Sequence, residues 1–234
     1  MIESLRRRLR ALVTRLLPQG DIAERTVKSG LWLGATNVVD RGLQIVLLVI
    51  LANLLAPRDF GLMGITLLTL TALRRFSVLG VDDALIQRAE DDVDAFLNSI
   101  WSVKAVRGVA LAGILGLIAP FVSTLFNEPR TTDLLRVIAL SPAVLGLRNP
   151  GVIYFRKDLE FHKQFVYKLS GSIVNFGVAL GYALLSADVW ALVLGFVAAD
   201  VTRVVVSYLV HEFRPRASID IDLIRELIDY GKWI

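Results

Sequence analysis

A charged pair stands in the middle of a stretch that is otherwise long and apolar enough to cross a membrane. Residues 31–55 read LWLGATNVVDRGLQIVLLVILANLL, with Asp40 and Arg41 near the centre. A transmembrane helix needs about 20 residues, and a charge at mid-membrane costs at least about 2.5–3.5 kcal/mol. We therefore expect the charged side of this helix to face protein or water.

The polar residues of this stretch share one side of the helix. At about 3.6 residues per turn, Asn37, Arg41 and Gln44 fall on one stripe with Leu48, and Asp40 lies beside it. The remaining faces are leucine, valine and isoleucine. The pattern predicts an α-helix with a polar stripe that avoids lipid.

The composition supports an all-α polytopic membrane protein. Hydrophobic residues make up 55% of the chain, whereas soluble domains are about 45–50% apolar. The chain has no cysteine, which excludes disulfides and thiolate metal sites. Its two histidines stand beside basic residues at segment ends, so we predict no metal site and no cofactor.

Apolar runs divide the chain into three parts. We expect a basic, amphipathic cytoplasmic segment over 1–28, a bundle of six spans over 29–211, and a cytoplasmic linker with the start of a seventh span over 212–234. The first part is either a helix on an anionic leaflet or a solvated tail. The six spans are expected at about 31–55, 60–80, 104–126, 134–155, 165–185 and 189–210.

Two of these spans carry further signals. Pro142 and Pro150 interrupt the fourth span, and prolines free backbone carbonyls that protein or water must satisfy. Gly108, Ala112 and Gly116 form a ladder of small residues in the third span, which favours close helix packing.

Lysine and arginine fall mainly on one side of this layout, which predicts that both termini are cytoplasmic. That side receives the N-terminal arginines, Arg74, Arg75, Arg88, Lys104, Arg107, Arg156, Lys157, Lys163, Lys168, Arg214 and Arg216. The other side receives only Arg58, Arg130 and Arg136.

A short internal repeat suggests a longer protein. Residues 30–33 read GLWL and residues 231–234 read GKWI, each after a helix of mixed charge. Parallel repeats of this kind are common in transporters. We therefore interpret the chain as the first half of a twelve-span protein.

Three blocks together resemble a known family. They are SGLWLGATNVVDRGLQIVLLVILANLLAPRDFGLMGI, GVDDALIQRAE and GVIYFRKDLEFHK. Nearly the whole chain is similar to O-antigen, teichuronic-acid and colanic-acid type exporters of the multidrug/oligosaccharidyl-lipid/polysaccharide superfamily. The resemblance implies one six-helix half of a flippase that moves an undecaprenyl-diphosphate-linked glycan across the inner membrane by alternating access. It also implies a lipid-linked oligosaccharide, membrane lipids and polysaccharide polymerase machinery as partners, and no nucleic acid.

The charges within the spans suggest how an anionic headgroup could be held, because guanidinium groups bind phosphate oxygens in pairs. The candidate substrate-binding residues are Arg41, Arg148, Arg74, Arg75, Asn37, Gln44 and Asn175. Asp40 and Asp200 are candidates for ion coupling. Each charge also has a structural interpretation: Asp40 and Arg41 could pair with neighbouring helices, Asp200 could pair with Arg203, and the other arginines could be topogenic or interfacial.

Three other classes of function are alternatives to a flippase. A drug/cation antiporter of the same superfamily needs acidic, aromatic cavity faces, but the deep charges are mostly arginines. An enzyme needs clustered carboxylates or a nucleophile, and the pairs Asp82-Asp83 and Asp91-Asp92 are typical of a solvated loop. A non-transporting scaffold stays open. We expect that the protein is not an enzyme.

If the polar stripe lines a water-filled path, single cysteines at Asn37, Arg41 and Gln44 should react with a membrane-impermeant thiol reagent. A cysteine at Val46, on the apolar side of the same span, should stay unlabelled. Labelling at Val46 alone would contradict the predicted orientation of the helix.

Overall fold

The computed structural model describes residues 21–77, 93–157 and 161–218, which form helices, turns and one extended segment, without any strand. The helices are α2 (Asp21–Leu54), α3 (Pro57–Phe76), α5 (Val93–Leu125), α6 (Thr131–Ile138), α7 (Leu140–Gly146), the 3₁₀ helix η1 (Pro150–Ile153), α8 (Tyr154–Lys157), α9 (Phe161–Leu185) and α10 (Trp190–Val210). Most of the predicted N-terminal segment, the Asp82-Asp83 and Asp91-Asp92 pairs and the repeat at 231–234 lie outside the described residues.

Four of the described helices are long and apolar enough to cross a membrane. These stretches are Gly34–Leu54, Leu97–Leu125, His162–Leu185 and Trp190–Val210. They correspond to the first, third, fifth and sixth predicted spans. Inside a bilayer a helix satisfies its own backbone polar groups, so long apolar helices are the expected solution. The fold class is therefore confirmed as an all-helical, polytopic membrane protein.

The second and fourth predicted spans differ from the other four. Helix α3 carries two charged residues at each end, Arg58 and Asp59 at its start and Arg74 and Arg75 at its finish. The fourth span is broken into α6, α7 and η1. The break at Ala139 precedes Pro142 by three residues, as expected because a proline ring clashes with the carbonyl four residues before it. Interruption of the fourth span is confirmed, and six crossings stay a prediction.

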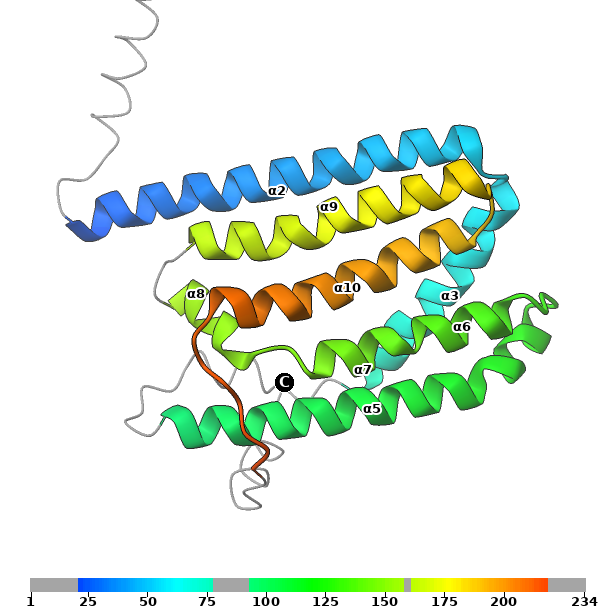
Figure 1. Ribbon diagram of the computed structural model, residues 1–234. Coiled ribbons are helices and arrows are strands. Elements are labelled where there is room, and N and C mark those ends of the chain that lie inside the picture. The colour runs from blue at the N-terminus through cyan, green and yellow to red at the C-terminus, as the bar shows by residue number, and fades with distance from the viewer. Residues whose placement is uncertain (1–20, 78–92, 158–160, 219–234) are drawn as a thin grey trace, which may run out of the picture.

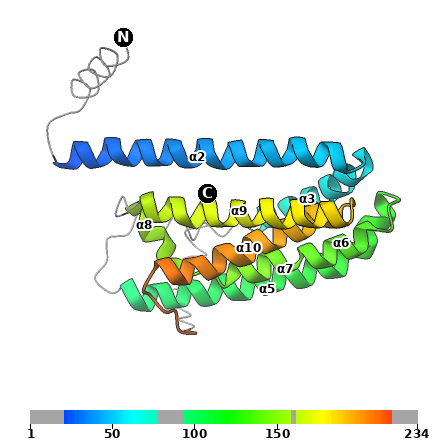
Figure 2. The ribbon, with the colours of Figure 1, turned by 45° about the horizontal axis from the view of Figure 1, so that its top comes forward.

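The long helices lie side by side (Figure 1), with α2, α5 and α9 running in one direction and α10 in the opposite one. Helix α2 lies at one edge and packs on α9, α9 packs on α10, and α10 packs on α6 and α7. Figure 2 shows α2 set apart from all helices except α9 along most of its length. The start of α2 and the end of α10 lie at the same end of the bundle (Figure 1), which is the arrangement that an even number of crossings gives.

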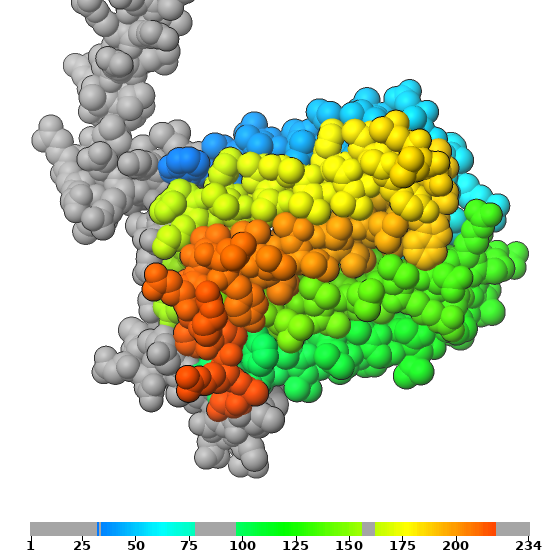
Figure 3. Space-filling model, in the orientation of Figure 1, coloured from blue at the N-terminus to red at the C-terminus, as the bar shows by residue number. Residues whose placement is uncertain are grey.

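Two apolar clusters hold the helices together, and α10 contributes to both. The larger joins α3, α5, α6 and α10 and includes Leu70, Leu115, Leu135 and Val193. The smaller joins α2, α9 and α10 through leucines on α2 and the small residues Ala179, Ala183 and Ala191. In the space-filling view α9 and α10 accordingly form a band between α2 and the α5–α7 side (Figure 3). Helix α10 is thus the central element of the described part.

Helices α5 and α7 approach so closely that only glycine fits at their crossing. A Cβ added at Gly108 would lie 2.3 Å from the carbonyl oxygen of Pro142, and one at Gly146 would lie 2.6 Å from that of Lys104. The predicted close packing is therefore confirmed at Gly108. Gly116 has open space beside it, so the ladder does not continue as a tight contact along the helix.

An extended segment after α10, residues 211–218, is bonded to the bundle. The buried Asn149 donates its Nδ2 to the carbonyl oxygen of Phe213 at 2.7 Å. The backbone N–H groups of Arg216 and Ser218 donate to Asn98 and Ser102 of α5 at 2.7 and 3.0 Å. The first residues of the predicted linker therefore tie the end of α10 to α5 and η1.

The α5–α7 crossing yields a stability prediction. Gly108→Ala should destabilise the protein by about 1–3 kcal/mol, because the new methyl group must displace backbone rather than a flexible side chain. Thermal unfolding in detergent would measure the change as a lowered midpoint. Gly116→Ala, on the same helix but beside open space, is the matched control and should leave the midpoint unchanged.

Candidate functional site

A carboxylate lies at the centre of the bundle. Asp200, in the middle of α10, is only 2% exposed. It accepts a hydrogen bond from the hydroxyl of Ser141 on α7 and pairs with Arg203, whose Nη1 lies 2.8 Å from its Oδ1. A buried charge needs a partner of opposite charge and further hydrogen bonds. Asp200 has both, and its predicted pairing with Arg203 is confirmed.

Ser141 also forms a hydrogen bond with a residue of a third helix, α3. Its side chain is fully buried, and its Oγ accepts a hydrogen bond of 2.7 Å from Nη2 of Arg74 on α3. Residues that are 67 positions apart in the chain are thereby linked. Arg74, Ser141 and Asp200 form a continuous chain of hydrogen bonds across α3, α7 and α10.

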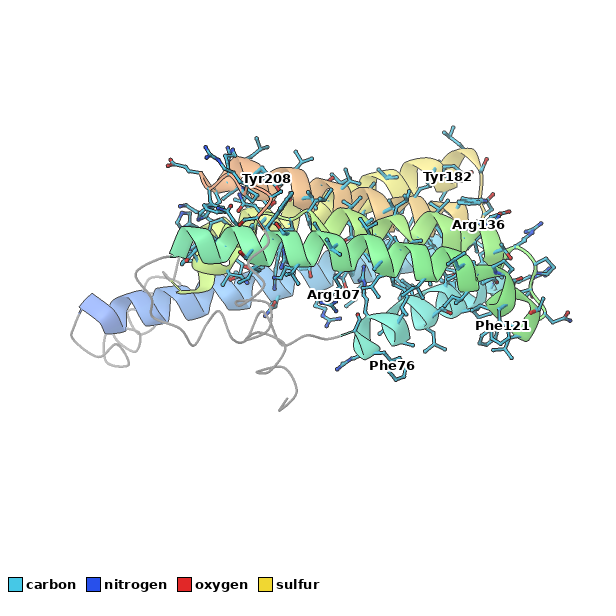
Figure 4. All side chains as sticks on the ribbon, turned by 90° about the horizontal axis from the view of Figure 1, so that it is seen from below. Phe76, Arg107, Phe121, Arg136, Tyr182 and Tyr208 are labelled. Atoms are coloured by element: carbon cyan, nitrogen blue, oxygen red, sulfur yellow. The ribbon has the colours of Figure 1, made fainter. Side chains whose placement is uncertain are left out.

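A second arginine approaches from α5. Nη2 of Arg107 donates to the hydroxyl of Ser77 at 2.9 Å, and that hydroxyl donates to the backbone carbonyl of Arg74 at 3.0 Å. The charge of Arg107 is close enough to act on the Arg74 guanidinium. Figure 4 shows Arg107 between the two ends of the bundle, well away from the labelled Tyr208 and Arg136.

We name Arg74, Arg107, Ser141, Asp200 and Arg203 the arginine cluster. Its members include three arginines and one carboxylate, of which Arg203 pairs with Asp200 directly and Arg74 is linked to Asp200 through Ser141. Buried or half-buried cations at this depth are costly unless they serve a site. The cluster is therefore the strongest candidate for holding an anion within the described residues.

A second set of contacts connects α2 to the arginine cluster through α9. The hydroxyl of Ser172 on α9 donates to Asp40 on α2, and Asp40 also accepts from Nε2 of Gln44 at 3.1 Å. The preceding residue, Gly171, faces α10, where an added Cβ would lie 2.5 Å from Nε of Arg203. Adjacent residues of α9 thus contact the α2 carboxylate and the α10 arginine.

The predicted stripe on α2 lies on the surface of the described part. Asn37, Arg41 and Gln44 are all exposed, while Thr36 is buried and Asp40 is half-buried against α9. Arg41 forms no ion pair with any described residue. Its guanidinium is therefore available to a second wall of protein, to water or to a ligand.

The other predicted site residues do not gather at one place. Arg75 is exposed near the end of α3. Arg148 is half-buried and donates to the hydroxyl of Tyr167 at 3.4 Å. The side chain of Asn175 fills the α9–α10 contact, where its Oδ1 would lie 2.6 Å from a Cβ at Gly195. Only Arg74 and Asp200, among the predicted residues, meet in the arginine cluster.

Sequence reasoning did not select Ser141, Ser172 or Arg107 for the site. One signal could have found them: each stands directly beside a glycine or proline within a predicted span, at Pro142, Gly171 and Gly108. Small or broken backbone lets neighbouring helices approach closely, so a polar side chain there can reach another helix. No group of three His, Asp or Glu side chains that could hold a metal occurs in the part of the chain described.

Comparison with known proteins identifies the family. Residues 50–234 match the family described as polysaccharide biosynthesis protein. The chain belongs to this family. The predicted resemblance to polysaccharide exporters is thereby confirmed.

Two relatives give the family more detail. The chain is 21% identical to the lipopolysaccharide biosynthesis protein WzxC of Escherichia coli strain K12 over 219 residues, which cover 91% of this chain and 44% of WzxC. It is 25% identical to the succinoglycan biosynthesis transport protein ExoT of Rhizobium meliloti strain 1021 over 176 residues, covering 75% of this chain and 35% of ExoT. The chain thus spans less than half the length of these relatives. No solved structure matches it significantly.

The buried pair on α10 yields a prediction with an internal control. Asp200→Asn should lower the free energy of unfolding by about 3 kcal/mol, because it leaves Arg203 without its charged partner inside the bundle. Asp133 and Arg136 on α6 have the same spacing, but both side chains are mostly exposed and 3.7 Å apart. Asp133→Asn should therefore cost less than about 0.5 kcal/mol. Equal losses in the two variants would show that Asp200 is not held as described.

Proposed function

We propose that the full-length protein is a flippase that exports an anionic, undecaprenyl-diphosphate-linked glycan across the inner membrane by alternating access. Membership of a polysaccharide biosynthesis family supports this, as does the similarity to a protein named for succinoglycan transport. The proposed partners are the lipid-linked oligosaccharide, membrane lipids and polysaccharide polymerase machinery. Both termini are proposed to be cytoplasmic.

The observation that carries the proposal is the presence of arginines on helices of the bundle at positions where a ligand can reach them. Arg41 is exposed on α2, and Arg74 is half-buried on α3. A diphosphate headgroup must give up its water to cross hydrocarbon. Guanidinium groups replace that water because they stay charged and bind phosphate oxygens in a planar, two-pronged geometry.

The described half supplies one wall of such a path. The chain spans 44% of WzxC, so the opposite wall is proposed to come from a second bundle in the longer protein. Parallel repeats about an axis normal to the membrane place substrate sites between the two halves. The exposed stripe on α2 is then the surface that faces the second half.

The remaining candidates are proposed for distinct tasks. Asn37 and Gln44 beside Arg41 are proposed to bind sugar hydroxyls, and Arg75 and Arg148 to attract the headgroup at the cytoplasmic mouth. Asp40 and Asp200 are proposed for ion coupling. Asn175 is proposed to support export by packing α9 against α10, because its side chain fills that contact.

No observation favours a drug/cation antiporter. That activity needs carboxylates that a cationic substrate can reach. Asp200 is buried beneath Ser141 and Arg203, and Asp40 is bonded to Ser172 and Gln44. The exposed charge on the polar stripe of α2 is that of Arg41, which repels a cation.

Replacing Arg41 by Ala should reduce export of surface polysaccharide at least about tenfold, because a charge-assisted contact to phosphate is lost. The measurement is surface polysaccharide in cells that depend on the full-length protein, together with the amount of variant in the membrane fraction. Arg136→Ala, an exposed arginine at the opposite end of the bundle, is the matched control and should export normally. Normal export by a correctly inserted Arg41→Ala variant would argue against the proposed function.

A further inference from the structure

We propose that Asp200 is a built-in counter-anion which holds Arg74 through Ser141 while the site is empty, and that an anionic headgroup takes Arg74 away from Ser141. This inference rests on the proposed function, because it concerns how the same site is kept ready for its ligand. It assigns positioning roles to Ser141 and Asp200, which are buried and cannot themselves bind an anion.

The hydroxyl of Ser141 gives the link a direction. A serine hydroxyl has one proton to donate and two lone pairs to accept with. Ser141 donates that proton to Asp200, and it accepts from Arg74 at 2.7 Å. The negative charge of Asp200 draws the hydroxyl proton to itself, which leaves the oxygen of Ser141 a better acceptor for Arg74. Ser141 passes the attraction of a buried carboxylate to an arginine that the carboxylate does not contact.

The two ends of this link differ in how firmly they are held. Asp200 is fixed by Arg203 one turn along the same helix, and Arg203 lies in a slot that exists because residue 171 of α9 is a glycine. Arg74 lies two residues before the end of α3, is half-buried, and reaches Ser141 by one guanidinium nitrogen. The arginine is consequently the end that can be exchanged.

A phosphate is a better partner for this arginine than a neutral hydroxyl. The bond to Ser141 has only one charged partner, whereas a phosphate adds the attraction of its own negative charge and can accept two N–H groups of the guanidinium at once. Arg107, whose charge acts on Arg74, adds to the attraction for an anion. Binding of a diphosphate would thus break the contact between Ser141 and Arg74.

The exchange changes how the helices are joined. The bond between Arg74 and Ser141 connects α3 to α7, a helix of seven residues that follows the break at Ala139. Losing it removes the polar link between α3 and α7, while Asp200 and Arg203 remain paired and α3 keeps its apolar packing against α5, α6 and α10. Occupation of the site and the polar contact between α3 and α7 are thereby coupled.

The test measures the affinity of the purified full-length protein for farnesyl diphosphate, a soluble isoprenoid diphosphate, with farnesol as the uncharged control probe. Ser141→Ala removes the competitor for Arg74, so it should tighten binding about three- to tenfold. Ser141→Cys keeps the volume with a weaker donor and acceptor, and should tighten binding in the same direction if the alanine variant does not fold. In Arg74→Gln and in the double variant Arg74→Gln/Ser141→Ala, binding should be equally weak.

The matched control is Ser123→Ala, a buried serine at the far end of α5 that bonds its own helix backbone. It should bind the probe as the wild type does. Unchanged or weaker binding in both Ser141 variants, with Arg74→Gln still impaired, would overturn this inference and leave the proposed function standing. Absence of diphosphate binding by the wild type, or equal binding of farnesol, would overturn both.

Discussion

The structure depends on a carboxylate buried in the middle of a long apolar helix. Asp200 stands midway along α10, and its burial obliges the surrounding helices to supply donors. Arg203 and Ser141 meet that need, and Ser141 in turn joins Arg74. Because α10 also belongs to both apolar clusters, the same helix sets the packing and the electrostatics of the bundle.

The parts of the fold that depend on local chemistry could be predicted from the sequence. Long apolar runs predict the four candidate membrane helices, because in lipid the backbone N–H and C=O groups can bond only within the helix. The spacing of Asp200 and Arg203 gives their ion pair, because residues three apart share a helix face. Pro142 gives the interruption of the fourth span, because a proline cannot complete the backbone hydrogen bonds of a continuous helix.

The links between helices could not be predicted in this way. Hydroxyls in helices usually bond the carbonyl four residues earlier, as those of Thr66, Thr69 and Thr202 do here. The proline beside Ser141 and the glycine beside Ser172 indicate that another helix can come close, but they do not show that these hydroxyls bond to Asp200 and Asp40. Which hydroxyl bonds to another helix depends on which helices are in contact and at what position along their length. It is therefore decided by packing. For the same reason Asn175, a polar residue well placed for a ligand, proved to fill a helix contact.

The broken fourth span explains why the arginine cluster forms where it does. A continuous helix from 131 to 153 would present its side chains at regular intervals and would keep α5 at an ordinary helix-to-helix distance. The break at Ala139 and the glycines at 108 and 146 instead bring α7 against α5 backbone to backbone.

Ser141 lies in the short helix α7, within reach of α3 on one side and α10 on the other. Interrupted helices in transporters line binding sites because their freed polar groups need partners. Here the interruption serves a related purpose, since it places one hydroxyl between a buried anion and a cation that a ligand can reach.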